Sequence, residues 1–394
     1  MLQYLSDTTL TGGFSVRFFH LSDLHLGIKL YEFDLLEDQE YILDQIVQKA
    51  AEERPEGIFI SGDIYDRSVP SEAAVRLFDS FIVELSELGS KVFIISGNHD
   101  SSDRLAFGSR LMEDKGVYIS QSYSGHVSPI VLNDSFGKIN IYLLPFIKPS
   151  AVRRFFPDET ISDYTDAVRT AVSEMAPDPR ERNIILAHQF ITGASRSESE
   201  DISVGGLDNV DASVFEPFDY AALGHIHGAQ NIHACNHVRY CGTPLKYSIS
   251  EASQQKSITV IDLKEKGDLT LQYIPLIPKR ELREIKGKYN DLMLKSSYSG
   301  TNTDDYIHVT LTDEDDIPDA IGRMRIIYPN IIKLDYDNKR TRTDSHLDPS
   351  SISKEISPLD LFKGFYKEQN GSDLSEKGEE LISKLIEKVW EENA

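Results

Sequence analysis

The sequence predicts an α/β fold in which two β-sheets pack face to face with helices outside, followed by a small α+β unit and a helical tail. Between about residues 17 and 119, β-branched and aromatic runs alternate with stretches of helical apolar spacing, which indicates βαβ units and a largely parallel sheet. From about residue 128, short strand-like runs predominate and helical patterns become rare. Hydrophobic residues make up 40% of the chain, which is enough for a substantial core.

The first half contains three strand-like runs, which are VRFFHLS from Val16, GIFIS at 57–61 and KVFIIS at 91–96. Apolar residues recur every three or four positions over 34–53 and again over 71–88. Such stripes are typical of amphipathic helices that cover a sheet. A third helix with ample apolar residues is expected over 102–115.

The second half supplies the remaining strands and one helical stretch near 159–176. Its strand-like runs are SPIVLN, KINIYLLPF, NIILAHQ, YAALGH, VRYCGT, SITVIDL and LTLQYIPL. Because strands are abundant here and helices few, these runs fit a second sheet packed on the first.

Composition divides the chain into five parts. The prolines of IPLIP mark the end of the strand-rich body, and a polar, turn-rich stretch later separates a small α+β unit from two tail helices broken at Asn370-Gly371. The predicted parts are an extension at 1–15, the body at 16–278, the α+β unit at 279–337, a linker at 338–357 and a helical segment at 358–394.

The chain is strongly acidic, with 41 Lys and Arg against 64 Asp and Glu, a net charge of −23. This average field repels polyanions, so a nucleic-acid substrate would need local basic patches, bound cations or a partner. Neither a signal-peptide pattern nor a run of eighteen apolar residues occurs, and only Cys235 and Cys241 are present, which suits reduced thiols. We therefore expect a cytoplasmic protein without membrane contact.

Polar side chains follow five strand-like runs at the point where each run ends. In HLSDLHLG, Asp23 and His25 are two residues apart and should project to the same side. Each motif alone is compatible with a turn, a helix cap or a structural histidine. All five end β-type runs, and the carboxyl ends of parallel strands form ligand sites, so we interpret them as one site. The other four motifs are GDIYD, GNHD, a lone histidine and GHIH, which supply Asp63, Asp66, Asn98, His99, His188, His225 and His227.

The side-chain types at these positions indicate metal chemistry. Imidazole and carboxylate groups without cysteine suit divalent manganese, iron or zinc. At least seven candidate ligands fit two ions better than one. Two such ions activate a bridging water and neutralise phosphate oxygens during in-line displacement. The sequence therefore predicts a two-metal hydrolase.

The order D-x-H, GDxxD, GNHD, lone histidine and GHxH resembles the calcineurin-like metallophosphoesterase superfamily. Longer stretches, including SGDIYDRSVP, SGNHDSSDRLAFGS, LAHQFITGASRSESE and CGTPLKYSISE, resemble nuclease subunits of bacterial DNA-repair complexes within it. The likeness is strong over about 16–280 and extends to the rest by layout. It implies a four-layer α/β/β/α sandwich, a small α+β capping domain at 279–337 and C-terminal helices that bind an ATPase subunit.

The resemblance also implies a role for each site residue. His99 would be a histidine that binds no metal and protonates the leaving oxygen. Asp66 would orient His99, although archaeal and eukaryotic relatives typically have histidine at that position, which leaves the role of Asp66 open. The implied metal ligands are Asp23, His25 and His227 for one ion, Asn98, His188 and His225 for the other, and Asp63 as the bridge between both.

From the same resemblance we expect manganese as the metal and DNA as the substrate. The implied activities are ATP-dependent 3′→5′ exonuclease action on duplex ends and endonuclease action on single strands, in DNA repair, recombination and replication. Helices 71–88 and 102–115 would form a homodimer. An alternative is a phosphatase of the same superfamily that acts on phosphoproteins or small molecules. A scaffold with a decayed site is disfavoured because every ligand position is filled.

The tail presents an apolar face at helical spacing. Two interpretations stay open, packing on the protein's own body or docking in a groove of another chain. The polar linker before the tail favours docking, and the resemblance implies the ATPase subunit as partner for 358–394. The residues on this face are Leu359, Phe362, Phe365, Tyr366, Leu374, Leu381, Leu385, Ile386 and Val389, with Trp390 beside them.

Overall fold

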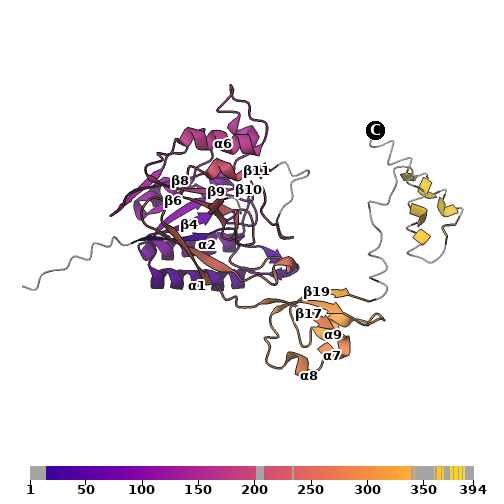
Figure 1. The fold of residues 1–394 in the computed structure, drawn as a ribbon. Helices are drawn as coiled ribbons and strands as arrows, with labels where there is room; N and C mark the ends of the chain where they lie inside the picture. The colour runs from indigo at the N-terminus through magenta and orange to yellow at the C-terminus, as the bar shows by residue number, and fades with distance from the viewer. Residues whose placement is uncertain are drawn as a thin grey trace, which may run out of the picture. The chain divides into compact units, whose positions relative to one another are not determined.

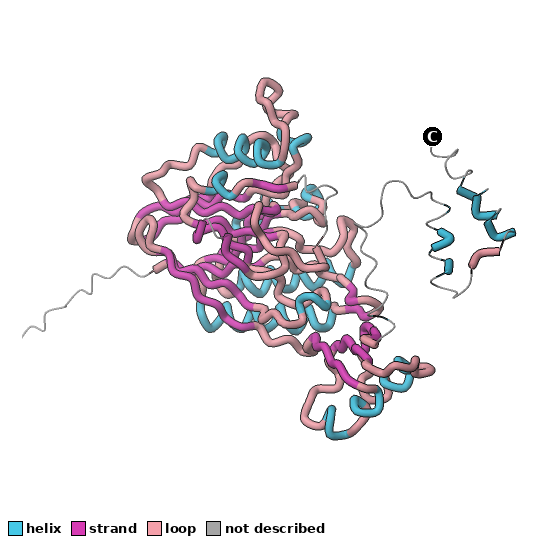
Figure 2. The backbone as a smooth tube through the Cα atoms, turned by 45° about the vertical axis from the view of Figure 1, so that its right-hand side comes forward, coloured by secondary structure: helices cyan, strands magenta, loops and turns pink. Residues whose placement is uncertain are grey.

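The computed structural model describes residues 15–200, 208–232, 235–338 and 341, together with parts of 359–386. Two six-stranded sheets pack face to face (Figures 1 and 2). Helices α1 (Leu36–Glu53) and α2 (Glu72–Glu87) cover the outer face of one sheet, and α6 (Tyr164–Met175) covers the outer face of the other. The predicted four-layer α/β/β/α sandwich is confirmed.

The first sheet has the strand order β16-β15-β1-β4-β5-β6. Four neighbouring strands run parallel, namely β1 (Val16–Leu21), β4 (Gly57–Ser61), β5 (Lys91–Ile95) and β6 (Val117–Ile119). The late strands β15 (Ser257–Leu263) and β16 (Leu269–Pro275) return to pair antiparallel beside β1. The carboxyl ends of β1, β4 and β5 therefore lie at one edge.

The second sheet has the order β13-β14-β12-β9-β8-β7. Its inner strands β8 (Gly137–Leu143), β9 (Arg182–His188), β12 (Tyr220–Gly224) and β14 (Cys235–Tyr240) are parallel. The outer strands β7 (Ile130–Asp134) and β13 (Gln230–Ile232) are antiparallel. Short pairs β2 (Lys29–Leu30) with β3 (Phe33–Asp34), and β10 (Phe190–Ile191) with β11 (Asn209–Val210), lie in the loops.

Alternation along the strands produces the layers. Phe18 and Phe59 point between the two sheets, where their rings stack with centroids 4.8 Å apart. Phe19 and Ile58 point the other way, toward α1 and α2. Successive strand residues face opposite sides, and both sides here are covered, so the strands read as continuous apolar runs. Each buried aromatic side chain contributes about 1.5–3 kcal/mol to this packing.

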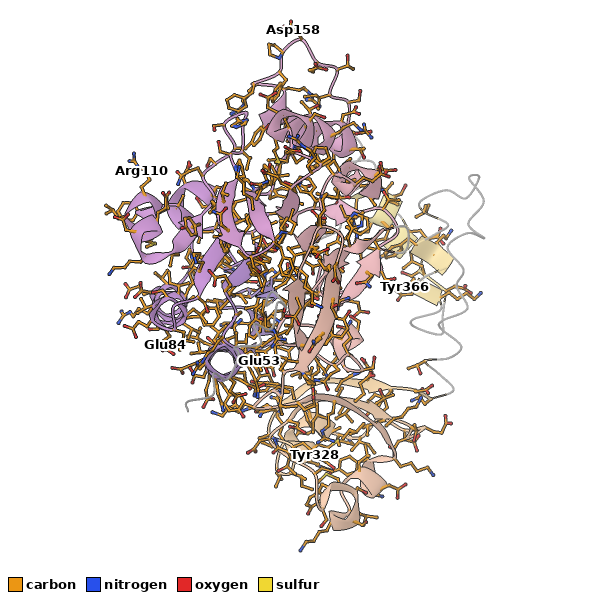
Figure 3. All side chains as sticks on the ribbon, turned by 60° about the vertical axis from the view of Figure 1, so that its left-hand side comes forward. Glu53, Glu84, Arg110, Asp158, Tyr328 and Tyr366 are labelled. Atoms are coloured by element: carbon orange, nitrogen blue, oxygen red, sulfur yellow. The ribbon has the colours of Figure 1, made fainter. Side chains whose placement is uncertain are left out.

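Three of the four predicted helices of the body are single helices, and one is not. The outer surfaces of α1 and α2 carry charged side chains such as Glu53 and Glu84 (Figure 3), together with the exposed apolar side chains of Tyr41, Val75 and Val83. The expected helix over 102–115 is instead α3 (Ser102–Leu105), α4 (Ser109–Met112) and a 3-10 turn at Glu113–Lys115. Gly108 separates the two helices with φ 77°, a left-handed conformation that ends a helical run. Further short helices are α5 (Pro149–Val152), Ala212–Phe215 and Ile249–Glu251.

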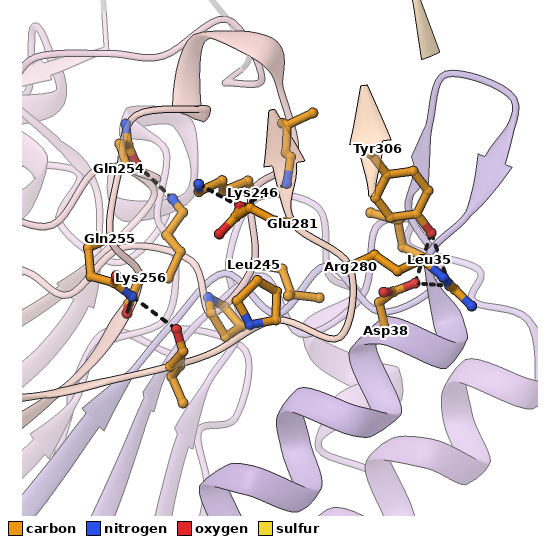
Figure 4. Close-up of a pocket in the computed structure, with 14 residues that line it drawn as sticks. Leu35, Asp38, Leu245, Lys246, Gln254, Gln255, Lys256, Arg280, Glu281 and Tyr306 are labelled. Carbon is orange, nitrogen blue, oxygen red and sulfur yellow. Dashed lines mark hydrogen bonds and ion pairs between the residues drawn. The ribbon is translucent and has the colours of Figure 1, made fainter. Parts of the chain in front are cut away.

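The α+β unit contains a three-stranded sheet of β17 (Leu282–Gly287), β18 (Tyr306–Leu311) and β19 (Ile331–Tyr336). Strand β17 had no counterpart among the predicted elements. Helices α7 (Tyr289–Leu292), α8 (Lys295–Tyr298) and α9 (Ala320–Met324) are short. Figure 4 shows how the chain enters this unit: Arg280 contacts Asp38 at 2.6 Å, and the hydroxyl of Tyr306 donates to the same carboxylate at 2.8 Å.

Residues 311–318 and 336–394 form a second compact unit. The described residues within 359–367 and 377–386 are helical, and Lys363 pairs with Glu379 at 2.7 Å. Residues 1–14, most of the predicted linker and Trp390 lie outside the described residues. In the part of the chain that is described, no helix is long and apolar enough to cross a membrane.

Candidate metal centre

The predicted site residues lie at the carboxyl ends of five parallel strands, three from the first sheet and two from the second. Asp23 and His25 follow β1, and Asp63 follows β4. His188 is the last residue of β9. Each loop therefore begins from a buried strand whose position the sandwich fixes. The remaining members are Asn98 and His99 after β5, and His225 and His227 after β12.

These side chains converge in one cluster. Its ligand atoms form three overlapping groups, each within 4.8 Å, namely Asp23 with His25 and His227, His25 with Asp63 and His99, and Asp63 with His188 and His225. Asp63 Oδ2 lies 3.2 Å from His188 Nε2 and 3.7 Å from His25 Nε2, so this carboxylate is between the two halves. The Oδ1 atom of Asn98 lies 3.0 Å from His188 Nε2 and 2.9 Å from His225 Nδ1.

One direct observation indicates that the cluster can bind divalent cations. Both ring nitrogens of His25 are buried, and neither has a hydrogen-bond partner. A buried imidazole in this state loses its hydrogen bonds to water and gains none in return, unless a metal binds one nitrogen. Burial also lowers the pKa of His25 well below its ordinary value, and the neutral ring is the form that binds metals.

The backbone at the site is held in an unusual conformation. Four of the predicted ligands have left-handed φ, with 54° at Asp23, 43° at His25, 49° at Asp63 and 103° at His225. Side-chain-bearing residues in this region cost about 1–2 kcal/mol each relative to right-handed helical backbone, so the surrounding fold must enforce them. Such positions cluster at functional sites.

Glycines make the close approach of these loops possible. A Cβ on Gly97 would lie 2.1 Å from Asp63 Oδ1, and one on Gly62 would lie 2.4 Å from His188 Nδ1. A Cβ on Gly224 would lie 2.0 Å from the carbonyl oxygen of Ser61. Each distance is shorter than any van der Waals contact, so these segments can approach one another so closely only because the three residues are glycine.

Two histidines are oriented through the nitrogen that faces away from the cluster. His188 Nδ1 lies 2.8 Å from the carbonyl oxygen of Ser61, which leaves Nε2 toward Asp63. His227 Nδ1 lies 2.7 Å from Ser199 Oγ, and that hydroxyl in turn donates to Glu251 Oε1 at 2.7 Å. Partners of this kind fix the ring and the tautomer of metal-binding histidines.

Glu251 is the centre of this support and was not predicted as a site residue. It is fully buried, and Lys256 Nζ pairs with its Oε2 at 2.6 Å. The same ammonium donates to the carbonyl oxygen of His227 at 2.8 Å. Burial by itself would raise the pKa of Glu251, but the interaction with His227, whose Nδ1 is 3.8 Å from Oε1, and the charge of Lys256 hold the pKa well below its usual value. The carboxylate is therefore ionised behind His227.

We expect Glu251→Gln to lower the affinity for divalent ions about 10–100-fold, the usual effect of losing a partner that orients a metal ligand. The amide keeps the shape of the side chain but removes the charge that pairs with Lys256 and orients Ser199 and His227. Manganese titration by calorimetry measures the change. Glu265→Gln, in an exposed turn between β15 and β16, is the control. Equal affinity in the two variants would contradict a supporting role.

Two further residues that sequence reasoning missed hold the loops in place. The carboxylate of Asp100 accepts hydrogen bonds from the backbone N–H of Ile64, Tyr65 and Gly97 at 2.9–3.1 Å. It thus joins the loop after β4 to the loop after β5. In α1, the Gln39 amide donates to the carbonyl oxygens of Leu24 and His25 and accepts from Gly27 N–H. The GNHD motif contained the signal for Asp100, whereas nothing local marked Gln39.

Electrostatics show how closely the charges of the cluster depend on one another. Burial raises the pKa of Asp23 to about 6. Burial would also raise the pKa of Asp63, but the charge of His188 outweighs this effect and holds the pKa of Asp63 well below its usual range. The pKa of His188 rises to about 9 because the attraction of Asp63 exceeds the effect of burial, whereas burial and the charge of His188 lower the pKa of His225 to about 3.

His99 and Asp66 lie beside the cluster, and the hydrogen bond between them involves the Asp66 backbone. His99 Nδ1 lies 2.9 Å from the carbonyl oxygen of Asp66, and His99 N–H donates to Asp63 Oδ1 at 2.9 Å. The Asp66 carboxylate lies 3.4 Å from Arg67 Nε. The ring of His99 packs edge to face on His25 with centroids 4.9 Å apart. Orientation of His99 through the Asp66 carbonyl would survive a change of side chain at that position.

Comparison with known proteins agrees with this fold and cluster. The family model of the calcineurin-like phosphoesterases matches residues 16–229, and a second model, described as the type 5 capsule protein repressor C-terminal domain, matches residues 278–370. Fold, side-chain set and family model together define a metal-dependent phosphodiesterase of the calcineurin-like class.

One relative shows which family within this class the chain belongs to. The D subunit of the nuclease SbcCD from Staphylococcus epidermidis is 34% identical over 374 residues, which are 93% of this chain and 97% of the relative. The chain belongs to the family of SbcCD nuclease D subunits. Among solved structures, it aligns with a dimetal phosphatase from Danio rerio at TM-score 0.40 and 12% identity, over 67% of this chain and 96% of that one. A protein of Thermus thermophilus aligns at TM-score 0.38 and 12% identity, over 66% and 99%. At these scores the two structures say nothing about function.

Proposed function

We propose that this chain is the nuclease subunit of an SbcCD-type complex and hydrolyses phosphodiester bonds of DNA in the cytoplasm. The observation that carries the proposal is the convergence of the seven predicted ligands in one cluster, with Asp63 between its halves. The relative's name, a subunit of a nuclease, supports a nucleic-acid substrate and a partner subunit. The expected reactions are ATP-dependent 3′→5′ exonuclease action on duplex ends and endonuclease action on single strands, in repair, recombination and replication.

In this proposal the residues divide into two ligand sets that share one carboxylate. Two divalent ions, with manganese as our choice, would supply an activated water and neutralise the phosphate oxygens. His99 stands at the edge of the cluster, where its Nε2 can protonate the departing oxygen while the Asp66 carbonyl accepts from Nδ1. The first set is Asp23, His25 and His227, the second is Asn98, His188 and His225, and Asp63 belongs to both.

A positive side chain near the cluster, that of Lys148, supports a polyanionic substrate despite the net charge of −23. Lys148 Nζ lies 5.9 Å above the ring of Phe146, and that ring packs against His188 with centroids 6.3 Å apart. Bound dications would add the largest local positive charges. We infer that the substrate enters a local positive field, and that the ATPase subunit contributes much of the remaining affinity for DNA.

The decisive experiment compares substrates with and without the partner. The purified chain is loaded with manganese and assayed on duplex ends, single-stranded oligonucleotides and a phosphorylated peptide. It is then assayed again with the ATPase subunit and ATP. Cleavage of DNA, with duplex digestion that requires ATP and the partner, supports the proposal. Faster turnover of the peptide than of any DNA would instead favour the phosphatase alternative.

We propose that residues 358–394 bind the ATPase subunit. The tail belongs to a compact unit distinct from the one that holds the metal cluster, and Leu381 and Leu385 are exposed in it. Large exposed apolar side chains on a helix fit a groove of another chain. In the same assay, a chain ending at 357 should keep manganese-dependent cleavage of single strands and lose ATP-dependent duplex digestion. A truncated chain that fails to fold would indicate that the tail packs on its own body.

We further propose a homodimer through the surface of α2, α3 and α4. Phe78 of α2 belongs to the core. Val75 is half-exposed, and Phe107 and Leu111 are 85% and 82% exposed, beside an apolar groove between α2 and α3. Large apolar side chains exposed beside an apolar groove are typical of protein interfaces.

If this surface joins two copies, Phe107→Glu with Leu111→Glu should give a monomer, because two charges would have to lose their water at the interface. Sedimentation velocity at micromolar concentration measures the change. The matched control is Ile326→Glu, which alters an apolar side chain that is 83% exposed in the α+β unit. A wild-type chain that already sediments as a monomer would rule this interface out.

A further inference from the structure

A polar groove opens beside the metal cluster, and the mechanism above does not use it. Its volume is about 740 Å³. Amide and hydroxyl side chains dominate the wall, and none of its described lining residues is acidic, in a chain with 64 Asp and Glu. Gly228, in the floor, directly follows the predicted ligand His227. The other lining residues are Ser195, Arg196, Ser197, Ala229, Gln230, Asn231, Gln254 and Gln255.

Arg196 supplies the only cationic side chain among these described lining residues, and its guanidinium is incompletely paired. Its centre lies 3.5 Å from the ring centroid of Phe190, which holds the fork in a fixed plane. Nη2 contacts both carboxylate oxygens of Asp208 at 3.4 Å, longer than the 2.7–2.9 Å of a strong charge-assisted hydrogen bond. Nε is buried without a hydrogen-bond partner. The fork therefore retains unused donor capacity.

The position of this guanidinium connects the groove to the cluster. Phe190 packs edge to face on the ring of His225, with centroids 6.4 Å apart. Arg196 thus packs on one face of the Phe190 ring, and Phe190 in turn contacts the ring of His225, which is a predicted metal ligand. On the opposite side, Gln230 fixes the wall by exchanging two hydrogen bonds at 2.8 Å with the backbone of Ser195. The loop that carries Arg196 is thereby tied to the loop that follows His227.

Planar guanidinium groups recognise phosphate, and amide or hydroxyl side chains bind nucleotide backbone and bases. We propose that the groove seats the DNA strand being cut and that Arg196 binds the phosphate that flanks the scissile one. The proposal rests on the nuclease function above and adds a specific substrate contact to it. Asp208 acts as a weak partner that the substrate phosphate replaces.

The test compares a substrate that has flanking phosphates with one that has none. With manganese-loaded chain, Arg196→Gln should raise KM for a single-stranded 12-mer about tenfold, with kcat changed less than twofold. The effect on KM for bis(p-nitrophenyl) phosphate, which has no neighbouring phosphate, should be at least fivefold smaller. The dependence of log KM on log salt for the 12-mer should fall by about 0.7, the value for one lost phosphate contact on a single strand.

Asp208→Asn separates substrate binding from a structural ion pair. If Arg196 binds phosphate, freeing its guanidinium should leave KM for the 12-mer equal to or below that of the wild type. If the pair is structural, Asp208→Asn should raise KM as Arg196→Gln does, and the inference is overturned. Equal losses on both substrates, or an unchanged KM in Arg196→Gln, also overturn it. Arg169→Gln, on the exposed surface of α6, controls for loss of one positive charge. A wild-type chain that cleaves no DNA would refute the nuclease function itself.

Discussion

Replacing His99 with alanine should lower kcat for DNA cleavage about 10²–10⁴-fold while the protein keeps its full content of divalent metal. The factor is the usual contribution of a positioned general acid. Metal content should persist because His99 is the one histidine of the cluster to which we assign no ion, although it lies within 4.8 Å of His25 and Asp63. Single-turnover kinetics and metal analysis on the same preparation measure both quantities.

His126→Ala is the control for this experiment, since His126 is exposed in a loop before β7. A substrate with a much better leaving group gives an independent check, because it needs little protonation. The defect of His99→Ala should shrink on such a substrate. If His99→Ala lost metal along with activity, His99 would have to be counted as a ligand and another acid would be required.

Gly97→Ala should remove both metal binding and activity, with kcat/KM reduced about 10²-fold or more. A methyl group on Gly97 would lie 2.1 Å from Asp63 Oδ1 and 2.4 Å from the Asp63 backbone nitrogen. Relief of this clash requires the loops after β4 and β5 to separate, which displaces the carboxylate shared by the two ligand sets. Displacement of a reacting geometry by about 1 Å is sufficient for a loss of this size.

Gly364→Ala is the matched control, because a methyl group there would meet no atom within 4 Å and the residue lies in the helical tail, away from the metal cluster in the sequence. Calorimetric titration with manganese, followed by cleavage assays, compares the two variants. A far-ultraviolet spectrum identical to that of the wild type would show that Gly97→Ala is still folded. Normal metal binding in Gly97→Ala would mean that the loops move apart easily, and Asp63 would then not be fixed as proposed.

Much of the fold could be predicted because its signals are local. The apolar runs at 57–61 and 91–96 correspond to β4 and β5, and the amphipathic stretch at 71–88 is α2. The predicted helix at 102–115 was wrong because an apolar stripe alone does not reveal a break. Gly108 adopts a left-handed conformation there, and the chain turns between two short helices. Strand β17 was missed because its charged, exposed residues do not give an apolar run.

The site could be predicted as far as its residues follow strand ends. The GDIYD and GNHD motifs brought Asp63 and Asn98 to the cluster as expected. Glu251 could not be found in this way, since it is 24 residues beyond His227 in the chain and meets it only through tertiary packing. The contact between His99 and Asp66 could not be predicted either. It involves the backbone carbonyl group of Asp66, which every residue type has, so the sequence gives no signal for it. Sequence motifs therefore identify the candidate metal ligands. The residues that orient those ligands are found only when the loops are seen together in the folded structure.

The origin of the ligands in both sheets has a consequence for how the protein matures. Asp23 accepts hydrogen bonds from the His225 backbone N–H at 3.0 and 3.1 Å, across a separation of 202 residues. Bringing such distant residues together costs a large loop-closure entropy. Their contact is therefore expected to form late in folding. A nascent polypeptide that has produced only β1 to β6 would contain Asp23, His25, Asp63 and Asn98 but none of His188, His225 and His227, and so only part of the ligand set. We therefore expect hydrolytic activity to appear only when both sheets of the sandwich have formed.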